Sequence, residues 1–301
     1  MSKKKITFAL VALLAALCFA AHFFAPDLFD DVMHSPRDAY TILTGSAPEP
    51  QKAEPQQITE YRLLPPVPVS QYSRHYIPNR SGLRKHAMYV NFLRRSYYVY
   101  TPRPVQDRGN AAAVILLHES RRDGVSMGDM WRQAADRHHL KLVAPDGRFG
   151  GWVYKDNRRF IRRLIKKLRN DPQVDPDRIY IVGHAHGGVM AITMGAEFSD
   201  DIAAVGTHAG MIDDQRHLPI IAAAPRKIPY CLLTGTENAR FPLAQVRWTA
   251  ETLAHHGHST VMIEIYGHNE WYYTLADWFN ETLLQCMMYA TRPTGGDENR
   301  Q

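Results

Sequence analysis

The sequence predicts an α/β protein with a mostly parallel central sheet and helices on both faces. From about residue 85 to residue 288, short β-rich runs alternate with longer helical patterns, which is typical of strands joined by crossover helices. The 301 residues are 45% hydrophobic and 22% charged, which are ordinary values for a globular protein. They exclude a largely disordered chain, a fibrous repeat and a many-pass membrane protein.

The N-terminus predicts export. Three lysines at positions 3–5 precede an uncharged apolar run over residues 6–25, which as a helix is long enough to cross a bilayer. The positive-inside rule places the rest of the chain across that membrane. Because Phe23, Phe24 and Pro26 make a poor cleavage site, we expect an uncleaved signal anchor. The expected location is the periplasmic or extracellular side, with secretion as the alternative if the segment is removed.

Three further regions follow the segment 1–25. Residues 26–60 are rich in Pro, Glu and Gln and are expected to be an extended linker. Residues 61–291 are the expected folded domain, and residues 292–301 are an expected flexible tail.

The elements of the domain are expected in regular alternation. The predicted strands are 97–100, 113–117, 141–144, 179–182, 202–206, 230–233 and 261–265. The predicted helices are 130–138, 160–168, 187–196, 243–253 and 271–288. In such a sheet, ligands bind at the carboxyl ends of the strands.

One junction predicts a sharp strand–turn–helix. The strand at 179–182 runs directly into Gly183-His-Ala-His-Gly-Gly188 and then into small and apolar residues. Glycines on either side of such a turn let it project its central residue, and the N-terminus of the following helix favours developing negative charge.

With this junction, the chain resembles the α/β-hydrolase family, most closely its exported esterase and polyhydroxyalkanoate-depolymerase-like branch. The resemblance covers roughly residues 95–288. Its motifs are Leu116-Leu-His-Glu-Ser-Arg-Arg-Asp-Gly124, Val143-Ala-Pro-Asp-Gly147, Val174-Asp-Pro-Asp-Arg-Ile-Tyr-Ile-Val-Gly-His-Ala-His-Gly-Gly188, Leu232-Leu-Thr-Gly-Thr236 and Tyr266-Gly-His-Asn-Glu-Trp271.

The resemblance implies a catalytic triad in which two positions have changed. His268 matches the general base, but Ala185 occupies the nucleophile position, and a methyl group cannot attack a carbonyl. Asn238 matches the acid position, and an amide does not stabilise an imidazolium as a carboxylate does. Glu237 and Asp213 are alternative acids away from the family's usual place.

The loop expected to hold the oxyanion has changed as well. Where the family has His-Gly, this chain has His118-Glu119, and a carboxylate repels a tetrahedral oxyanion. His186 lies beside the same site. Ser120 and Ser126 are alternative nucleophiles in this loop. Trp152 and Trp271 are expected to line the pocket, or else only to pack.

A strongly basic helix is expected at residues 158–169. Its apolar face is expected to be core, whereas the other face is either solvated or attracted to anionic lipid headgroups. That face carries Arg158, Arg159, Arg162, Arg163, Lys166, Lys167 and Arg169. Without these seven and the three N-terminal lysines, 26 basic residues remain against 30 acidic ones. Basicity is therefore local, and we expect no nucleic-acid partner.

No metal or cofactor is expected. His118, His184, His186 and His268 could meet near the strand ends, but the turn at Ala185 separates the side chains that flank it. Cys231 and Cys286 either pair or stay as thiols, and the sequence leaves this open.

The leading hypothesis is an exported, membrane-tethered α/β-hydrolase-fold protein with a degenerate serine-esterase site. Its partner would be an ester-like ligand or a protein, and whether any enzymatic activity remains is left open. The first alternative is an ester or polyester hydrolase in which His268 activates water. The second is a membrane-surface module that uses the basic helix.

Overall fold

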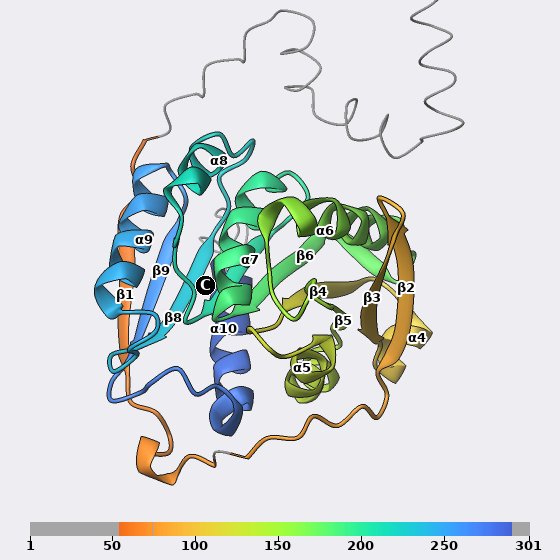
Figure 1. Cartoon of the computed structure of the whole chain (residues 1–301), viewed down its shortest axis with the longest axis horizontal. Helices are drawn as coiled ribbons and strands as arrows, with labels where there is room; N and C mark the ends of the chain where they lie inside the picture. The colour runs from red at the N-terminus through yellow and green to blue at the C-terminus, as the bar shows by residue number, and fades with distance from the viewer. Residues whose placement is uncertain (1–53, 74, 291–301) are drawn as a thin grey trace, which may run out of the picture. The chain divides into compact units, whose positions relative to one another are not determined.

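A nine-stranded sheet with helices on both faces organises the chain (Figure 1). The computed structural model describes residues 54–73 and 75–290. The strand order is β1-β9-β8-β7-β6-β4-β5-β3-β2, and neighbours are parallel except for the pairs β2/β3 and β3/β5. The strands are β1 (Ile58–Leu63), β2 (Arg84–Val90), β3 (Leu93–Tyr100), β4 (Ala111–Leu117), β5 (Lys141–Pro145), β6 (Val174–His184), β7 (Ala204–His208), β8 (Tyr230–Gly235) and β9 (Thr260–Ile265). The predicted fold class is confirmed.

The buried central strand β4 is apolar throughout, whereas the exposed edge strand β1 contains polar residues. Every residue of β4 is buried, and its run of Ala, Val, Ile and Leu suits a strand covered on both faces. β1 is an edge strand that pairs with β9, and most of its residues are exposed. Because β1 begins at Ile58, three residues that the sequence assigns to the linker belong to the sheet. Thr59 and Glu60 are polar and exposed, so a hydrophobicity pattern does not reveal the start of this strand.

The helices form two layers, each with its own hydrophobic core. α6 (Tyr154–Arg169), α7 (His186–Glu197) and α9 (Leu243–His255) cover one face, and α5 (Gly124–His138) and α10 (Ala276–Ala290) cover the other. Two short helices, α4 (Arg103–Arg108) and α8 (Leu218–Ala222), lie in connections. The remaining helical turns are the 3-10 segments η1 (Val69–Gln71), η2 (Gln215–His217) and η3 (Tyr273–Leu275).

The last predicted helix, 271–288, starts later than expected. Trp271 donates its backbone N–H to Asn269 Oδ1 at 2.8 Å, and η3 follows before α10 begins at Ala276. This turn places the aromatic rings of Tyr272 and Tyr273 against His184, with centroids 4.6 and 6.3 Å away.

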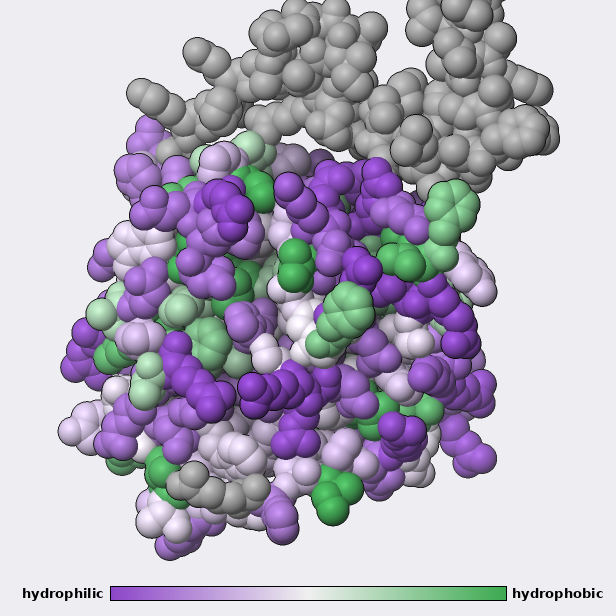
Figure 2. Space-filling model, viewed as in Figure 1, coloured by the Kyte–Doolittle hydropathy of each residue, from purple (hydrophilic) through white to green (hydrophobic). Residues whose placement is uncertain are grey.

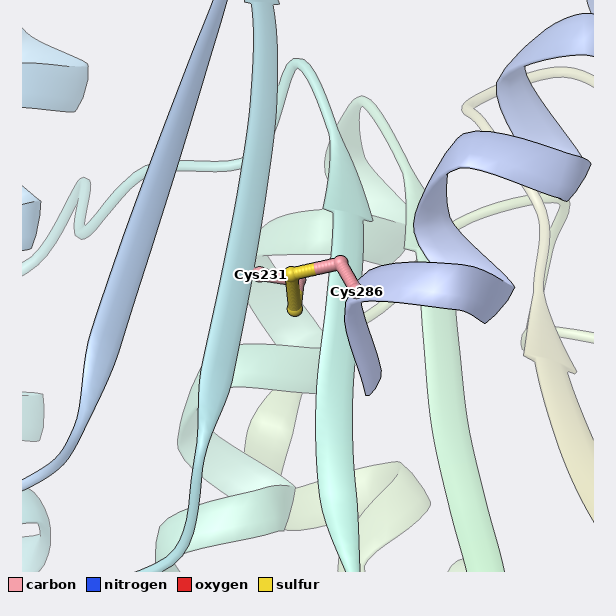
Figure 3. Close-up of a disulfide and its surroundings, with 2 residues drawn as sticks. All are labelled: Cys231 and Cys286. Atoms are coloured by element: carbon pink, nitrogen blue, oxygen red, sulfur yellow. A yellow bond between two sulfur atoms is a disulfide. The ribbon is translucent and has the colours of Figure 1, made fainter. Parts of the chain in front are cut away.

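A disulfide joins β8 to the C-terminal helix (Figure 3). It links Cys231, fully buried in β8, to Cys286 of α10, with the two Cα atoms 6.2 Å apart. The pairing that the sequence left open is thus present, and it ties α10 to β8, the third strand from the β1 edge of the sheet.

The predicted anchor at residues 6–25 and the tail at 292–301 lie outside the described residues. Among the residues that are described, no helix combines the length and apolar character needed to span a bilayer.

Candidate functional site

The turn at Ala185 has the geometry of a sharp elbow. β6 ends at His184 and α7 begins at His186, and Ala185 between them has φ 51° and ψ −118°, a region that L-residues rarely adopt. A Cβ on Gly187 would lie 2.0 Å from the carbonyl oxygen of Leu117, so only glycine allows this close approach of helix and strand. Ala185 therefore lies at the apex of a sharp turn between strand and helix, and its side chain there is a methyl group.

A cavity of about 590 Å³ lies over this elbow. Its apolar wall consists of Ala185, Met211 and Phe241. Its polar wall carries charges of both signs and consists of Glu119, Ser120, Arg121, His186, Asp213, Arg240 and Glu270. Of the residues predicted for the site or named as alternatives, those that line this cavity are Ala185, Glu119, His186, Ser120 and Asp213, whereas His268, Asn238 and Glu237 do not line it.

Ser120 and His186 are in contact at the cavity. Ser120 Oγ forms a hydrogen bond with His186 Nδ1, and both residues are exposed. The other serine of this loop, Ser126, is buried and donates its hydroxyl to the carbonyl of Asp123 at 2.6 Å. Of these two serines, only Ser120 is accessible to a ligand in this cavity.

His268 is buried away from the cavity. The residue is 0% exposed, and both of its ring nitrogens have partners. Nδ1 lies 3.0 Å from the hydroxyl of Tyr72, and Nε2 lies 3.0 Å from Nε2 of His208. His268 is not among the residues that line the cavity. Because both ring nitrogens already have partners, the ring has no free nitrogen for a ligand there.

The contact with His208 extends into a chain of three buried histidines. His208 Nδ1 lies 2.9 Å from His184 Nδ1, and His184 Nε2 lies 3.7 Å from a carboxylate oxygen of Glu119. We call His184, His208 and His268 the histidine chain. It connects Tyr72 in the interior to Glu119 at the cavity wall.

The chemistry of neutral imidazole couples the tautomers of the three rings. A neutral ring has one N–H donor and one acceptor nitrogen, so each contact between two rings pairs a donor with an acceptor. His184 Nδ1 also lies 3.3 Å from the backbone carbonyl oxygen of His208, which can only accept. The proton position on one ring therefore fixes the tautomer of the other two.

Burial keeps the histidine chain neutral. It lowers the pKa of His268 to about 3, with a further contribution from His184. Burial also lowers the pKa of His184, and it lowers that of His208 well below its usual value, assisted by the two neighbouring imidazoles. Desolvation of Tyr72 raises its pKa to about 12, so its hydroxyl keeps its proton.

The predicted acid position has a structural role. Asn238 is buried, and its side-chain oxygen accepts the backbone N–H groups of Arg240 and Phe241 at 3.1 and 2.9 Å. Glu237 is exposed, and its backbone N–H donates to the carbonyl of His268. Neither side chain has a hydrogen bond to the His268 ring, both nitrogens of which are already occupied.

His118 and the two predicted pocket tryptophans hold loops in place. His118 Nε2 accepts the backbone N–H of Gly147 at 2.9 Å, and burial lowers the pKa of this imidazole. Trp152 donates its indole N–H to the carbonyl of His118, and Trp271 donates its own to Thr274. Neither tryptophan lines the cavity at Ala185, and of the two alternatives the structure shows packing: Trp152 packs against one hydrophobic core and Trp271 against the other.

The basic helix α6 is amphipathic as predicted, but its cations are not uniformly directed to solvent. Arg158 forms an ion pair with Glu197 of α7. Arg159 donates to the side chain of Asn91, and Arg163 donates to the carbonyl of Tyr89. Arg162 lies over the ring of Phe198. Lys166 and Lys167 are exposed near the end of the helix.

No sequence motif marks His208 of the histidine chain or Tyr72, which contacts the chain through His268. His208 ends β7, the strand beside the elbow strand, and a polar residue at that strand end was the available signal. Tyr72 follows a proline-rich segment that offers no pattern. Among the described residues, no group of three or more His, Cys, Asp or Glu side chains is arranged to hold a metal ion.

The comparisons with known proteins agree with this fold. Residues 150–271 match the model of the dienelactone hydrolase family. The chain is 38% identical over 53 residues to NocK of Nocardia uniformis subsp. tsuyamanensis, which is named as a candidate esterase. That match covers 18% of this chain and 15% of the relative, so it extends over only a small part of either protein.

Two solved esterase structures are similar over most of the domain. A thermostable esterase superposes with a TM-score of 0.57 at 17% identity, over 70% of this chain and 64% of its own. Est1E from Butyrivibrio proteoclasticus superposes with a TM-score of 0.58 at 12% identity, over 70% of this chain and 99% of its own. The protein thus has the α/β-hydrolase fold, and within that fold its residues 150–271 match the dienelactone hydrolase family.

Proposed function

We propose that this protein binds an ester-like ligand over Ala185 without forming an acyl-enzyme at the elbow. One observation carries the proposal: the elbow presents a methyl group to a cavity, while His268 directs both ring nitrogens into the histidine chain. In an intact triad the histidine must reach the nucleophile's hydroxyl. Here position 185 has no hydroxyl and the histidine has no free nitrogen. We interpret Ala185 as the replacement of a catalytic serine.

The cavity walls support a ligand with both an apolar and a polar part. Met211, Phe241 and Ala185 suit an acyl chain or an aromatic ring. Arg121 and Arg240 suit a carbonyl or carboxylate oxygen. An ester of a short or aromatic acid combines these features, as does the ferulic acid bound to two structurally similar esterases.

The environment we propose is outside the cytoplasm, at a membrane. Lysines 3–5 and the apolar run at 6–25 support export and anchoring, and the Cys231–Cys286 disulfide is of a kind that persists in oxidising compartments. We also propose, from the sequence motifs, that the chain is related to the polyhydroxyalkanoate-depolymerase-like branch of the esterases.

The Ser120–His186 contact favours a second candidate, slow ester hydrolysis through Ser120. His186 Nδ1 can take the hydroxyl proton while Ser120 Oγ bonds to the ester carbonyl carbon. The carbonyl–alkoxy bond then breaks, and the proton passes to the leaving alcohol. Water hydrolyses the acyl-serine. The earlier alternative, water activated by His268, is not supported by a ring that is buried and fully hydrogen-bonded.

The decisive experiment compares binding and turnover in the full chain. Methyl ferulate and ferulic acid are titrated calorimetrically, and hydrolysis of p-nitrophenyl acetate and butyrate is followed under the same conditions. We expect saturable binding that is lost in Met211→Trp, which fills the cavity, and kept in Met288→Trp at the surface of α10.

The hydrolysis rates distinguish a binding protein from an esterase that uses Ser120. Near-background rates that are equal in the natural chain, His268→Ala and Ser120→Ala support a binding protein. A rate lost only in Ser120→Ala supports the second candidate. A rate lost in His268→Ala contradicts both, and the absence of saturable binding to any of these compounds contradicts the ligand class.

A further inference from the structure

We propose that the tip of the β2–β3 hairpin, together with the adjoining part of α6, docks on the surface of an anionic bilayer. The tip consists of Tyr89, Asn91, Phe92 and Leu93. This surface is separate from the cavity at Ala185, and the inference does not depend on what that cavity binds.

The hairpin tip exposes three large apolar side chains. Phe92 is 100% exposed, Tyr89 is 66% exposed and Leu93 is 46% exposed. The face of the molecule seen in Figure 2 is mainly hydrophilic with scattered hydrophobic residues. A cluster of exposed apolar side chains on one turn is a recurrent sign of a contact surface.

The backbone of the turn makes Phe92 an unusual residue at this position. Val90 pairs with Leu93, so Asn91 and Phe92 form a two-residue turn, and their φ angles are 49° and 64°. Both values are positive, as in a type I′ turn, whose second position is commonly glycine. Neither backbone preference nor burial explains a phenylalanine here. Position 92 also lies between the exposed side chains of Tyr89 and Leu93 and next to the basic helix α6, and contact with an apolar environment accounts for this combination.

Two arginines of α6 form hydrogen bonds with the hairpin tip. Arg159 donates to Asn91 Oδ1 at 2.6 Å, and Arg163 donates to the backbone carbonyl of Tyr89. Figure 1 shows the β2–β3 hairpin beside α6 at one end of the sheet. The aromatic tip and the basic helix therefore form one continuous surface.

The surface along the hairpin and α6 has an excess of basic residues. Residues 84–95 and 158–169 contain no acidic residue, although Arg158 and Arg169 pair with Glu197 and Asp201 of other elements and Arg95 is buried. Arg94 follows the tip directly, whereas Arg84 and Lys85 lie at the other end of the hairpin. Arg84, Lys85, Arg94 and Lys167 are exposed. Basic residues attract the anionic headgroups of a membrane surface, and aromatic rings favour the interface between headgroups and acyl chains. An anionic bilayer satisfies both features of this surface.

The experiment places a reporter at the tip and a matched reporter elsewhere. Phe92→Trp and Phe149→Trp are prepared in the full chain and reconstituted into phosphatidylcholine vesicles with or without 30% phosphatidylglycerol, with acyl chains plain or brominated. Phe149 is a suitable control because it is also an exposed phenylalanine with a positive φ, 93% exposed and 54°. Fluorescence from the native tryptophans is subtracted by using the natural chain.

We expect bromine to quench the added tryptophan of Phe92→Trp at least twofold more in anionic than in neutral vesicles, and 0.5 M salt to reduce the difference. Phe149→Trp should show no such dependence. Arg94→Gln with Lys167→Gln should weaken quenching at position 92. Equal quenching in both lipids, no quenching at 92, or the same response from Phe149→Trp would overturn the proposal.

A second variant uses the turn itself. Phe92→Gly restores the residue type that the turn favours, so we expect a melting temperature equal to or above that of the natural chain. In a chain that also carries Tyr89→Trp as the reporter, the same change should reduce quenching in anionic vesicles. A lower melting temperature, or unchanged quenching, would contradict a phenylalanine retained for membrane contact.

Discussion

The Nε2 atoms of His208 and His268 lie 3.0 Å apart, and both residues are fully buried. In a serine hydrolase the histidine directs one nitrogen to the nucleophile and the other to an acid. Here those two partners are His208 and Tyr72. Under our proposal that Ala185 replaces a catalytic serine, the site differs from a triad in the partners of His268 as well as at the elbow.

Restoring the hydroxyl alone should not restore acylation. In Ala185→Ser the new hydroxyl lacks a base, because His208 still occupies His268 Nε2. We expect Ala185→Ser combined with His208→Val to release p-nitrophenol at least about tenfold faster than Ala185→Ser alone, since the base is then available to activate the serine. The measurement is the pre-steady-state burst, with the acyl adduct at residue 185 identified by mass spectrometry.

The control for this restoration is His208→Val on its own, which should stay at background because position 185 is still a methyl group. A burst from Ala185→Ser without the second change would show that His208 does not restrain His268. No burst from the double variant, if it is folded, would place the defect in the missing acid instead.

The histidine chain should make the protein less stable in mild acid. An unfolded histidine titrates near pH 6.5, whereas burial lowers the pKa of folded His268 to about 3. Below pH 6.5 the unfolded chain binds protons that the folded chain does not, so stability is complete above that pH and decreases as the pH falls. For His268 alone the loss at pH 5 is on the order of 2 kcal/mol.

Urea unfolding at pH 7.5, 6 and 5 measures this dependence. Because acidic groups titrate in the same range, the comparison is between variants: His208→Val should flatten the pH dependence, while His255→Gln at an exposed position should leave it unchanged. An identical slope in all three proteins would show that the chain does not contribute.

The sequence predicts the fold and the elbow well because both depend on local patterns. Buried parallel strands appear as continuous apolar runs, and Gly183 and Gly187 mark a turn that only glycine permits. The partners of His268 could not be predicted. His208 reaches His268 only because β7 and the loop after β9 end at the same edge of the sheet, and the tautomers that connect them follow from tertiary contacts. The phenylalanine at the hairpin turn escapes prediction for a related reason, since it contradicts the usual turn preference.

The elbow should tolerate no side chain at Gly187. An added Cβ would lie 2.0 Å from the Leu117 carbonyl oxygen and 2.6 Å from that of His118, and these backbone atoms belong to β4 and the loop that follows it. We expect Gly187→Ala to lower the free energy of unfolding by about 1–3 kcal/mol through overpacking. Gly151→Ala is the matched control, because a Cβ there meets no atom within 4 Å. Equal stability of the two variants, measured by urea unfolding, would contradict the close approach of α7 to β4.

The Cys231–Cys286 disulfide should stabilise the attachment of α10. It closes a loop between residues 55 positions apart and restrains the unfolded chain, so we expect Cys286→Ala to lower the free energy of unfolding by about 2–4 kcal/mol. Dithiothreitol should lower the urea midpoint of the natural chain by a similar amount and leave Cys286→Ala unchanged, which separates the bond from other effects of the reductant. Because α10 also supplies Phe279, whose ring centroid lies 4.4 Å from that of His208, reduction should increase hydrogen exchange in α10 and at the end of β7 together. An unchanged midpoint after complete reduction would show that core packing alone holds α10 in place.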